Sequence, residues 1–122
     1  MATILVVDDH EDLLYLMTTC LTLKGYSVRT ARSKSEFLDS LGALDPDLII
    51  LDVMLGQDNG RDLCKEIKSS RHKHIPILLY SAVSHLLDDF EECQADGILE
   101  KPFEINVLLQ EVQGLISKAG EH

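Results

Sequence analysis

Residues 48–52 read LIILD, four consecutive apolar residues followed at once by an aspartate. Two further short apolar runs, at residues 4–7 and 77–80, have the same character. None of the three alternates apolar with polar residues, which is typical of parallel strands whose two faces are both covered by helices. We therefore predict that these runs form the central strands of a parallel sheet.

Two weaker runs, at residues 27–30 and 98–99, complete a set of five predicted strands. Apolar residues at helical spacing follow each strand, within the ranges 13–21, 37–41, 63–67, 86–93 and 105–116. The first helix should end before Gly25, and Ser33 with Glu36 resembles a capping box at the start of the second. This (βα)5 alternation predicts an α/β fold of the flavodoxin-like type, a doubly wound five-stranded parallel sheet in the order 2-1-3-4-5.

The composition limits the possible functions. A chain of 122 residues with 45% hydrophobic residues fits a single domain over 1–122, and no apolar run approaches the ~20 residues of a membrane span. The net charge of −10 opposes direct binding to nucleic acid. Three widely spaced cysteines and the lack of a secretory signal favour a reducing cytoplasm. We expect a cytoplasmic domain without membrane insertion, either a stand-alone regulator or a piece of a larger protein.

Polar side chains stand where the predicted strands end. Asp8 and Asp9 follow the first strand, Asp52 the third, Ser81 the fourth and Lys101 the fifth. The carboxyl ends of parallel strands meet at one edge, and the first and third strands are neighbours in the predicted order. Three carboxylates should therefore share a pocket, where a hard divalent cation such as Mg²⁺ or Mn²⁺ would neutralise them. A metal, a lysine and a hydroxyl together suit phosphate chemistry.

These residues resemble the receiver domains of bacterial two-component response regulators over almost the whole chain. The matching motifs are Asp8-Asp9, Asp52 within residues 51–54, Gly60, Ser81-Ala82 and Lys101-Pro102-Phe103. The resemblance implies a phospho-acceptor signalling domain in a phosphorelay. By this resemblance, we expect the domain not to be an enzyme acting on external substrates. It should only assist its own phosphotransfer and a slow autodephosphorylation.

The resemblance also implies a role for each site residue. Asp52 is the phosphorylated residue, with Lys101 and Ser81 as its catalytic partners. Asp9, Asp52 and the backbone carbonyl of Met54 ligate the metal, and Asp8 assists largely through water. The Lys101-Pro102 bond is expected to be cis. The donor is a histidine kinase or a phosphotransfer protein that docks near the first helix, with Leu14 as a candidate contact.

The chain departs from the family pattern at several positions. Ile98 stands where relatives carry an aromatic residue that takes part in signalling. Tyr80 should not replace that residue, because neighbouring strand residues point to opposite faces and Ser81 takes the pocket side. Gly56 replaces a common proline and should loosen the loop after Asp52. Met54 and Val83 cannot orient a water through their side chains, which predicts a long-lived phosphorylated form.

Three other functions remain to be weighed. A haloacid-dehalogenase-like phosphatase would need a second aspartate where Met54 stands. A flavodoxin-like cofactor carrier would place a phosphate in the loop after the first strand, where residues 8–12 carry four carboxylates. A degenerate receiver that acts only as an interaction module is the stronger rival, and the intact set of acidic residues with Lys101 argues against it.

Overall fold

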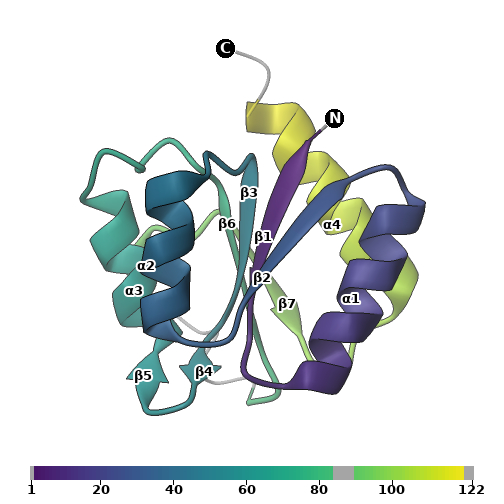
Figure 1. Ribbon diagram of the computed structural model, residues 1–122, viewed down its shortest axis with the longest axis horizontal. Coiled ribbons are helices and arrows are strands. Elements are labelled where there is room, and N and C mark those ends of the chain that lie inside the picture. Colours follow the sequence, from purple (N-terminus) through teal and green to yellow (C-terminus); the bar gives the residue numbers. More distant parts are fainter. Residues whose placement is uncertain (1, 84–89, 120–122) are drawn as a thin grey trace.

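The computed structural model describes residues 2–83 and 90–119. Its main feature is a five-stranded parallel sheet (Figure 1) formed by β1 (Thr3–Val7), β2 (Ser27–Ala31), β3 (Leu48–Asp52), β6 (Ile77–Ser81) and β7 (Gly97–Glu100). The strands lie in the order β2-β1-β3-β6-β7. Numbered along the chain, this is the predicted order 2-1-3-4-5, so the predicted flavodoxin-like fold is confirmed.

Four helices cover the two faces of the sheet, namely α1 (Glu11–Leu23), α2 (Lys34–Ala43), α3 (Gly60–Lys68) and α4 (Ile105–Ala119). Figure 1 shows α1 and α4 on one face and α2 and α3 on the other. Each face of the central strands is therefore buried, which explains why β3 and β6 consist entirely of buried residues.

Strand alternation divides the buried residues into two apolar layers. The layer beneath α2 and α3 includes Leu5, Leu51 and Leu79, and the layer beneath α1 and α4 includes Ile4, Ile50 and Leu78. Neighbouring residues of one strand thus belong to opposite layers. The same alternation decides on which side each polar residue at the end of a strand leaves the sheet.

The predicted helix-terminal signals are present. The Ser33 hydroxyl accepts a hydrogen bond from the Glu36 backbone N–H at 3.2 Å, and the Glu36 carboxylate accepts one from the Arg32 backbone N–H at 3.1 Å. This is a capping arrangement for α2. Gly25 has a φ of +94° just after α1, a conformation that glycine adopts without steric cost.

The apolar stripe of α1 differs from the predicted one. Met17 and Leu21 are buried as predicted, and Leu13 packs half-buried against the core, but Leu16 is exposed and Leu14 is buried in its place. The predicted and the observed stripe both have helical spacing and share Met17 and Leu21, so periodicity alone did not distinguish them. Leu14 is therefore a core residue, and the expectation that it contacts a partner is wrong.

Part of the fourth predicted helix, around residues 86–93, lies outside the described residues. Its described part is a short 3₁₀ turn, η2 (Phe90–Cys93). Cys93 is buried in the layer beneath α3, where its carbonyl accepts a hydrogen bond from the Cys64 thiol at 3.2 Å. The fifth predicted helix corresponds to α4.

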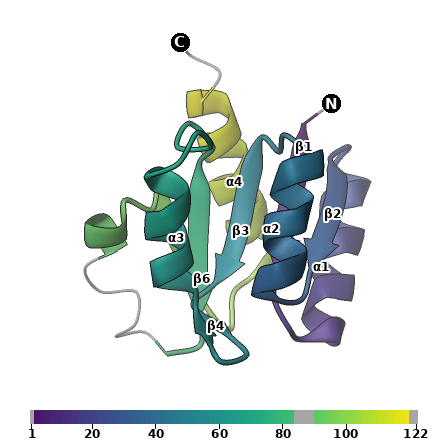
Figure 2. The ribbon, with the colours of Figure 1, turned by 60° about the vertical axis from the view of Figure 1, so that its left-hand side comes forward.

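A small antiparallel hairpin follows Asp52. It consists of β4 (Met54–Leu55) and β5 (Asp58–Asn59), and Figure 2 shows it next to the carboxyl ends of the central strands. Gly56, at φ +59°, is the first of the two residues that connect its strands. Glycine at this position favours a tight two-residue hairpin. The structure thus gives Gly56 a conformational role in the hairpin, and the expectation that it loosens this loop stays a prediction.

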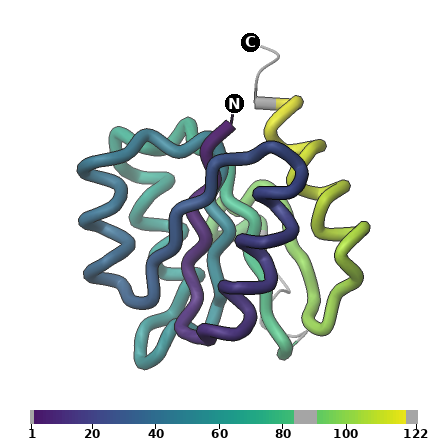
Figure 3. The backbone as a smooth tube through the Cα atoms, turned by 45° about the vertical axis from the view of Figure 1, so that its right-hand side comes forward, coloured from purple at the N-terminus to yellow at the C-terminus, as the bar shows by residue number. Residues whose placement is uncertain are grey.

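The two ends of the described chain lie near one another (Figure 3), at the amino-terminal edge of the sheet. β1 begins there, and α4 returns to the same edge after β7. The loops at the opposite edge carry the polar strand-end residues. Within residues 2–83 and 90–119, no helix combines the length and the apolar character that a membrane crossing requires.

Candidate functional site

The three predicted carboxylates meet at the carboxyl edge of the sheet. Asp8 and Asp9 directly follow β1, and Asp52 is the last residue of the neighbouring strand β3. Together with His10 they form a cluster whose candidate ligand atoms all lie within 4.8 Å of one another. Asp8 and Asp52 are buried, whereas Asp9 is exposed. The convergence predicted from strand order is thus present.

Lys101 joins the two buried carboxylates. Its Nζ lies 3.2 Å from Asp8 Oδ2 and 3.1 Å from Asp52 Oδ2. The Lys101-Pro102 peptide bond is cis, as expected, and the Lys101 backbone N–H donates to the Ser81 carbonyl at 2.8 Å. One cation faces two buried carboxylates, so the pocket keeps a negative charge.

The burial of Asp52 makes its charge costly. Burial raises the pKa of Asp52 above its usual value, and the charge of Asp8 adds to the rise. The Met54 backbone N–H, which donates to Asp52 Oδ1 at 3.0 Å, and Lys101 only partly offset this effect. Asp52 is therefore a desolvated carboxylate with both oxygens held in place.

Asp8 has a fuller set of partners. Its Oδ1 accepts from the backbone N–H of His10 at 2.9 Å and contacts His10 Nδ1 at 2.9 Å. Its Oδ2 accepts from Lys101 and from the hydroxyl of Tyr80. Burial would raise the pKa of Asp8, but these partners, Tyr80 foremost, lower it overall. The hydrogen bond to Asp8 in turn raises the pKa of His10.

The donor set fits a hard divalent cation. Carboxylate oxygens at the edge of a buried pocket are the ligands that Mg²⁺ prefers, and an exposed Asp9 leaves an open approach. His10 adds a nitrogen that sequence reasoning did not assign to the site. Its position directly after Asp9 was the only signal that could have indicated it.

The comparisons with known proteins agree with this geometry. The sequence model of one protein family, the response regulator receiver domain, matches residues 4–113. The chain belongs to the response regulator receiver family. It is 36% identical over 117 residues to a probable transcriptional regulator, ycf27, of Cyanidium caldarium, covering 94% of this chain and 46% of that protein. It is 35% identical over 120 residues to the transcriptional regulatory protein GltR of Pseudomonas aeruginosa, covering 96% and 50%. The receiver thus spans about half the length of these curated relatives.

Solved structures of receivers share its fold. A receiver domain of a signal transduction histidine kinase from Syntrophus aciditrophicus superposes with a TM-score of 0.92 at 29% identity, covering 100% of this chain and 95% of that one. The response regulator TrrA from Thermotoga maritima, solved in complex with Mg²⁺-BeF, has a TM-score of 0.85 at 32% identity, covering 94% and 99%. The receiver assignment places the chain among phospho-acceptor signalling modules of two-component systems rather than enzymes.

Ser81 lies at the expected place in the receiver pocket but is engaged elsewhere. It is fully buried at the end of β6, and its hydroxyl oxygen accepts a hydrogen bond from the Val83 backbone N–H at 3.0 Å. The hydroxyl thus stabilises its own turn in this structure. Its role toward a phosphoryl group stays a prediction.

Tyr80 lies on the side of the sheet that strand alternation predicts, yet it still reaches the pocket. Its ring does leave the sheet on the α1 and α4 side, in the layer that contains Leu78. The side chain is nevertheless long enough for its hydroxyl to reach Asp8. Strand alternation fixes the side of a residue and not its reach, and the expectation that Tyr80 does not replace the aromatic residue missing at position 98 stays a prediction.

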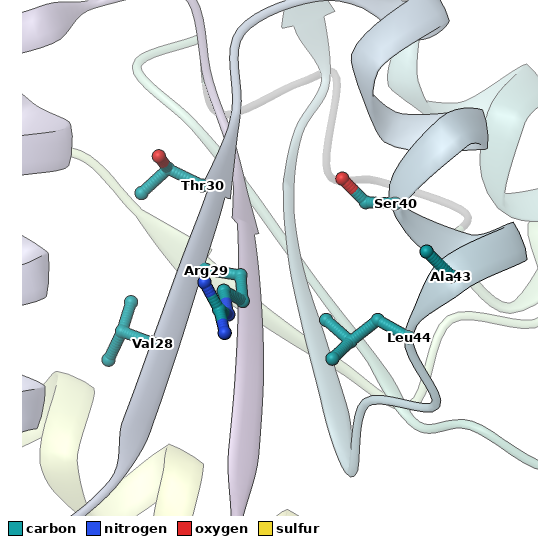
Figure 4. A pocket seen from close by; sticks show the side chains of 6 residues that line it. All are labelled: Val28, Arg29, Thr30, Ser40, Ala43 and Leu44. Atoms are coloured by element: carbon teal, nitrogen blue, oxygen red, sulfur yellow. The ribbon is translucent and has the colours of Figure 1, made fainter.

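One surface pocket lies apart from the acidic cluster. A surface pocket of about 520 Å³ lies between β2 and the end of α2 (Figure 4), and it is lined by Val28, Arg29, Thr30, Ser40, Ala43 and Leu44. None of these residues belongs to the acidic cluster. This pocket therefore contributes no residue to the acidic cluster at the strand ends.

Proposed function

We propose that this receiver accepts a phosphoryl group on Asp52 with the help of a divalent cation, Mg²⁺ or Mn²⁺. The observation that carries the proposal is the position of Lys101, within 3.2 Å of both Asp8 and Asp52 in a pocket of three carboxylates. Asp9, Asp52 and the carbonyl of Met54 would hold the metal, with Asp8 behind them. The metal, when bound, would neutralise the acidic cluster and the charge of the incoming phosphoryl group.

The chain's own residues can perform the rest of the transfer. An oxygen of the Asp52 carboxylate forms a bond to phosphorus while the bond from phosphorus to the donor breaks, and the bonding electrons leave with the donor. The Met54 N–H and Lys101 hold the Asp52 carboxylate in one orientation. Lys101 can also balance the charge of the phosphoryl oxygens, and the Ser81 hydroxyl can donate to one of them after it leaves the Val83 N–H.

The proposal is tested by locating the modified residue. With Mg²⁺ and acetyl phosphate, we expect the purified chain to gain one phosphoryl group by intact mass. Borohydride reduction of the acyl phosphate followed by peptide mapping should place the modification at residue 52. A stable modification on a serine, or labelling that is independent of Mg²⁺, would contradict the proposal.

We expect Asp9→Asn to lower the affinity for Mg²⁺ by about tenfold or more, because it removes one of few carboxylate ligands. Titration calorimetry of the wild type and the variant measures this directly. Asp12→Asn is a suitable control, since it removes an exposed carboxylate from the first turn of α1. An equal loss of Mg²⁺ affinity in both variants would show that Asp9 acts only through its negative charge and not as a ligand.

We further propose that the donor is a histidine kinase or phosphotransfer protein in the cytoplasm, docking on the exposed side of α1. Tyr15 is 76% exposed and Leu16 44% exposed on this side, so α1 offers two adjacent apolar side chains to a protein partner. These two residues take the place of the incorrectly chosen Leu14.

Tyr15→Asp should slow phosphotransfer from the kinase by about tenfold and leave phosphorylation by acetyl phosphate unchanged, because only the protein donor needs the docking surface. Leu38→Asp, on the exposed side of α2, is the matched control. A candidate kinase can be chosen by profiling phosphotransfer from purified kinases. Equal slowing with both donors would show that Tyr15 supports the pocket rather than docking.

A further inference from the structure

Tyr80 is a fully buried polar residue for which apolar packing alone gives no reason. It occupies the penultimate position of β6, paired in register with Asp52 of β3 and Leu99 of β7. Its ring packs edge-on against Phe103, with 6.4 Å between centroids. A phenylalanine would fill the same layer without burying a hydroxyl group, which costs free energy unless it is hydrogen-bonded.

The hydroxyl finds its partner in the receiver pocket. It donates to Asp8 Oδ2, the same oxygen that accepts from Lys101. Asp8 therefore has two donors on Oδ2, and its Oδ1 contacts the backbone N–H and the ring Nδ1 of His10. Among these donors, the Tyr80 hydroxyl and Lys101 come from inside the fold, whereas the ring of His10 is largely exposed.

The ring of Tyr80 also supports the lysine. Lys101 Nζ lies 4.3 Å from the ring centroid, a distance at which an ammonium group is attracted to an aromatic face. Lys101 is thus held by three groups, which are the Asp8 carboxylate, the Asp52 carboxylate and the Tyr80 ring. Tyr80 therefore contacts Asp8 and Lys101. Among the described residues it makes no hydrogen bond to Asp52.

We propose that Tyr80 is a positioning residue for the phosphotransfer reaction, with its hydroxyl fixing the Asp8 carboxylate and its ring supporting the Lys101 ammonium group. The inference rests on the proposed acceptor role of the pocket. Fixing Asp8 keeps the acidic pair in one arrangement for the cation. Supporting Lys101 keeps its charge beside Asp52 instead of in the solvent. Both effects reduce the reorganisation that the transfer needs.

Tyr80→Phe isolates the hydroxyl, because it keeps the ring and the packing. We expect the rate of phosphorylation by acetyl phosphate in saturating Mg²⁺ to fall about tenfold, in the range of a lost hydrogen bond to a charged group. Tyr26→Phe is the matched control, since Tyr26 is half-buried against the same apolar layer but has no contact with the acidic residues in any described interaction. Thermal unfolding of both variants verifies that they are folded.

A spectroscopic measurement tests the same contact without phosphorylation. The chain has no tryptophan and three tyrosines, so Tyr15→Phe/Tyr26→Phe leaves Tyr80 as the only strong fluorophore. A tyrosine hydroxyl bound to a carboxylate is quenched, and we expect its emission to change as Mg²⁺ is titrated in. The Tyr80→Phe variant, which keeps Tyr15 and Tyr26, should show no such change in emission. Calorimetry of the same samples verifies that Mg²⁺ binds.

Two results would each overturn the inference. One is a wild-type rate of phosphorylation in Tyr80→Phe, and the other is a constant Tyr80 emission across a titration in which calorimetry detects Mg²⁺ binding. A chain that binds Mg²⁺ with a change in Tyr80 emission but is never phosphorylated would contradict the proposed acceptor function instead, while leaving the contact between Tyr80 and the pocket supported.

Discussion

Asp52→Asn is expected to abolish phosphorylation and to make the folded chain more stable at neutral pH. The first effect follows because the amide oxygen is a poor nucleophile and cannot form the acyl phosphate. The second follows from the pKa of Asp52, which burial and the charge of Asp8 raise. An ionised Asp52 therefore costs stability, and its removal should raise the free energy of unfolding by on the order of 1 kcal/mol.

The pH dependence of this gain has a definite sign. A folded-state pKa above the unfolded value means that the folded chain binds the Asp52 proton more tightly, so the cost is full above the folded pKa. The cost disappears as pH falls through the folded pKa toward the ordinary value of 3.8. Urea unfolding of the wild type and the variant should show a difference at pH 7 that narrows on acidification.

Two comparisons make the Asp52→Asn experiment specific. Asp58→Asn removes an exposed carboxylate from the nearby hairpin and should change neither phosphorylation nor stability appreciably. Mg²⁺ should stabilise the wild type more than Asp52→Asn, since a ligand stabilises the state that binds it. A variant that is less stable than the wild type at pH 7 without Mg²⁺ would contradict the view that Asp52 is held at a cost.

Gly60→Ala is expected to destabilise the fold by about 3 kcal/mol or more and to disturb the acceptor. A Cβ at Gly60 would lie 2.1 Å from the Asp52 carbonyl oxygen and 2.9 Å from the Val53 Cα, both backbone atoms. The Gly60 N–H also donates to the Val53 carbonyl at 2.7 Å, so α3 begins directly against the end of β3. The backbone cannot yield here without moving Asp52.

The measurement is urea unfolding together with phosphorylation at a temperature where the variant remains folded. We expect both the free energy of unfolding and the rate of phosphorylation to be lower than in the wild type. Gly114→Ala is the matched control, because Gly114 lies within α4 with no heavy atom within 4 Å of an added Cβ. That substitution should stabilise the chain by about 0.5–1 kcal/mol. A Gly60→Ala variant as stable as the wild type would show that the helix entry can shift.

The fold and the acidic cluster were predictable from the sequence because they follow from simple periodicities. Unbroken apolar runs indicated buried parallel strands, and strand order then brought Asp8 and Asp52 together. Gly60 was matched to the receiver motifs, and in the structure it begins α3 at a place where a side chain does not fit. The reason is the close approach of the Asp52 carbonyl and not an unusual φ. This approach could not be predicted from the sequence, because it depends on how the start of α3 lies against the end of β3.

The residues that were misjudged depend on features that periodicity does not describe. Two helical stripes of α1 shared Met17 and Leu21, and only packing selected the one that contains Leu14. Alternation placed the Tyr80 ring correctly but could not give the reach of its hydroxyl. The positive φ with which Gly56 closes a hairpin was likewise not visible in the apolar pattern. The lifetime expected from Met54 stays a prediction.

The nearness of the two ends of the described chain, residues 2 and 119, has a practical consequence for handling the domain. Both lie at the edge of the sheet opposite the acidic pocket (Figure 3), because every strand runs in the same direction and α4 returns along the sheet. A tether at either end, such as an affinity tag on a sensor surface, would present the pocket outward. Immobilised chains should therefore remain accessible to protein donors and to small reagents alike.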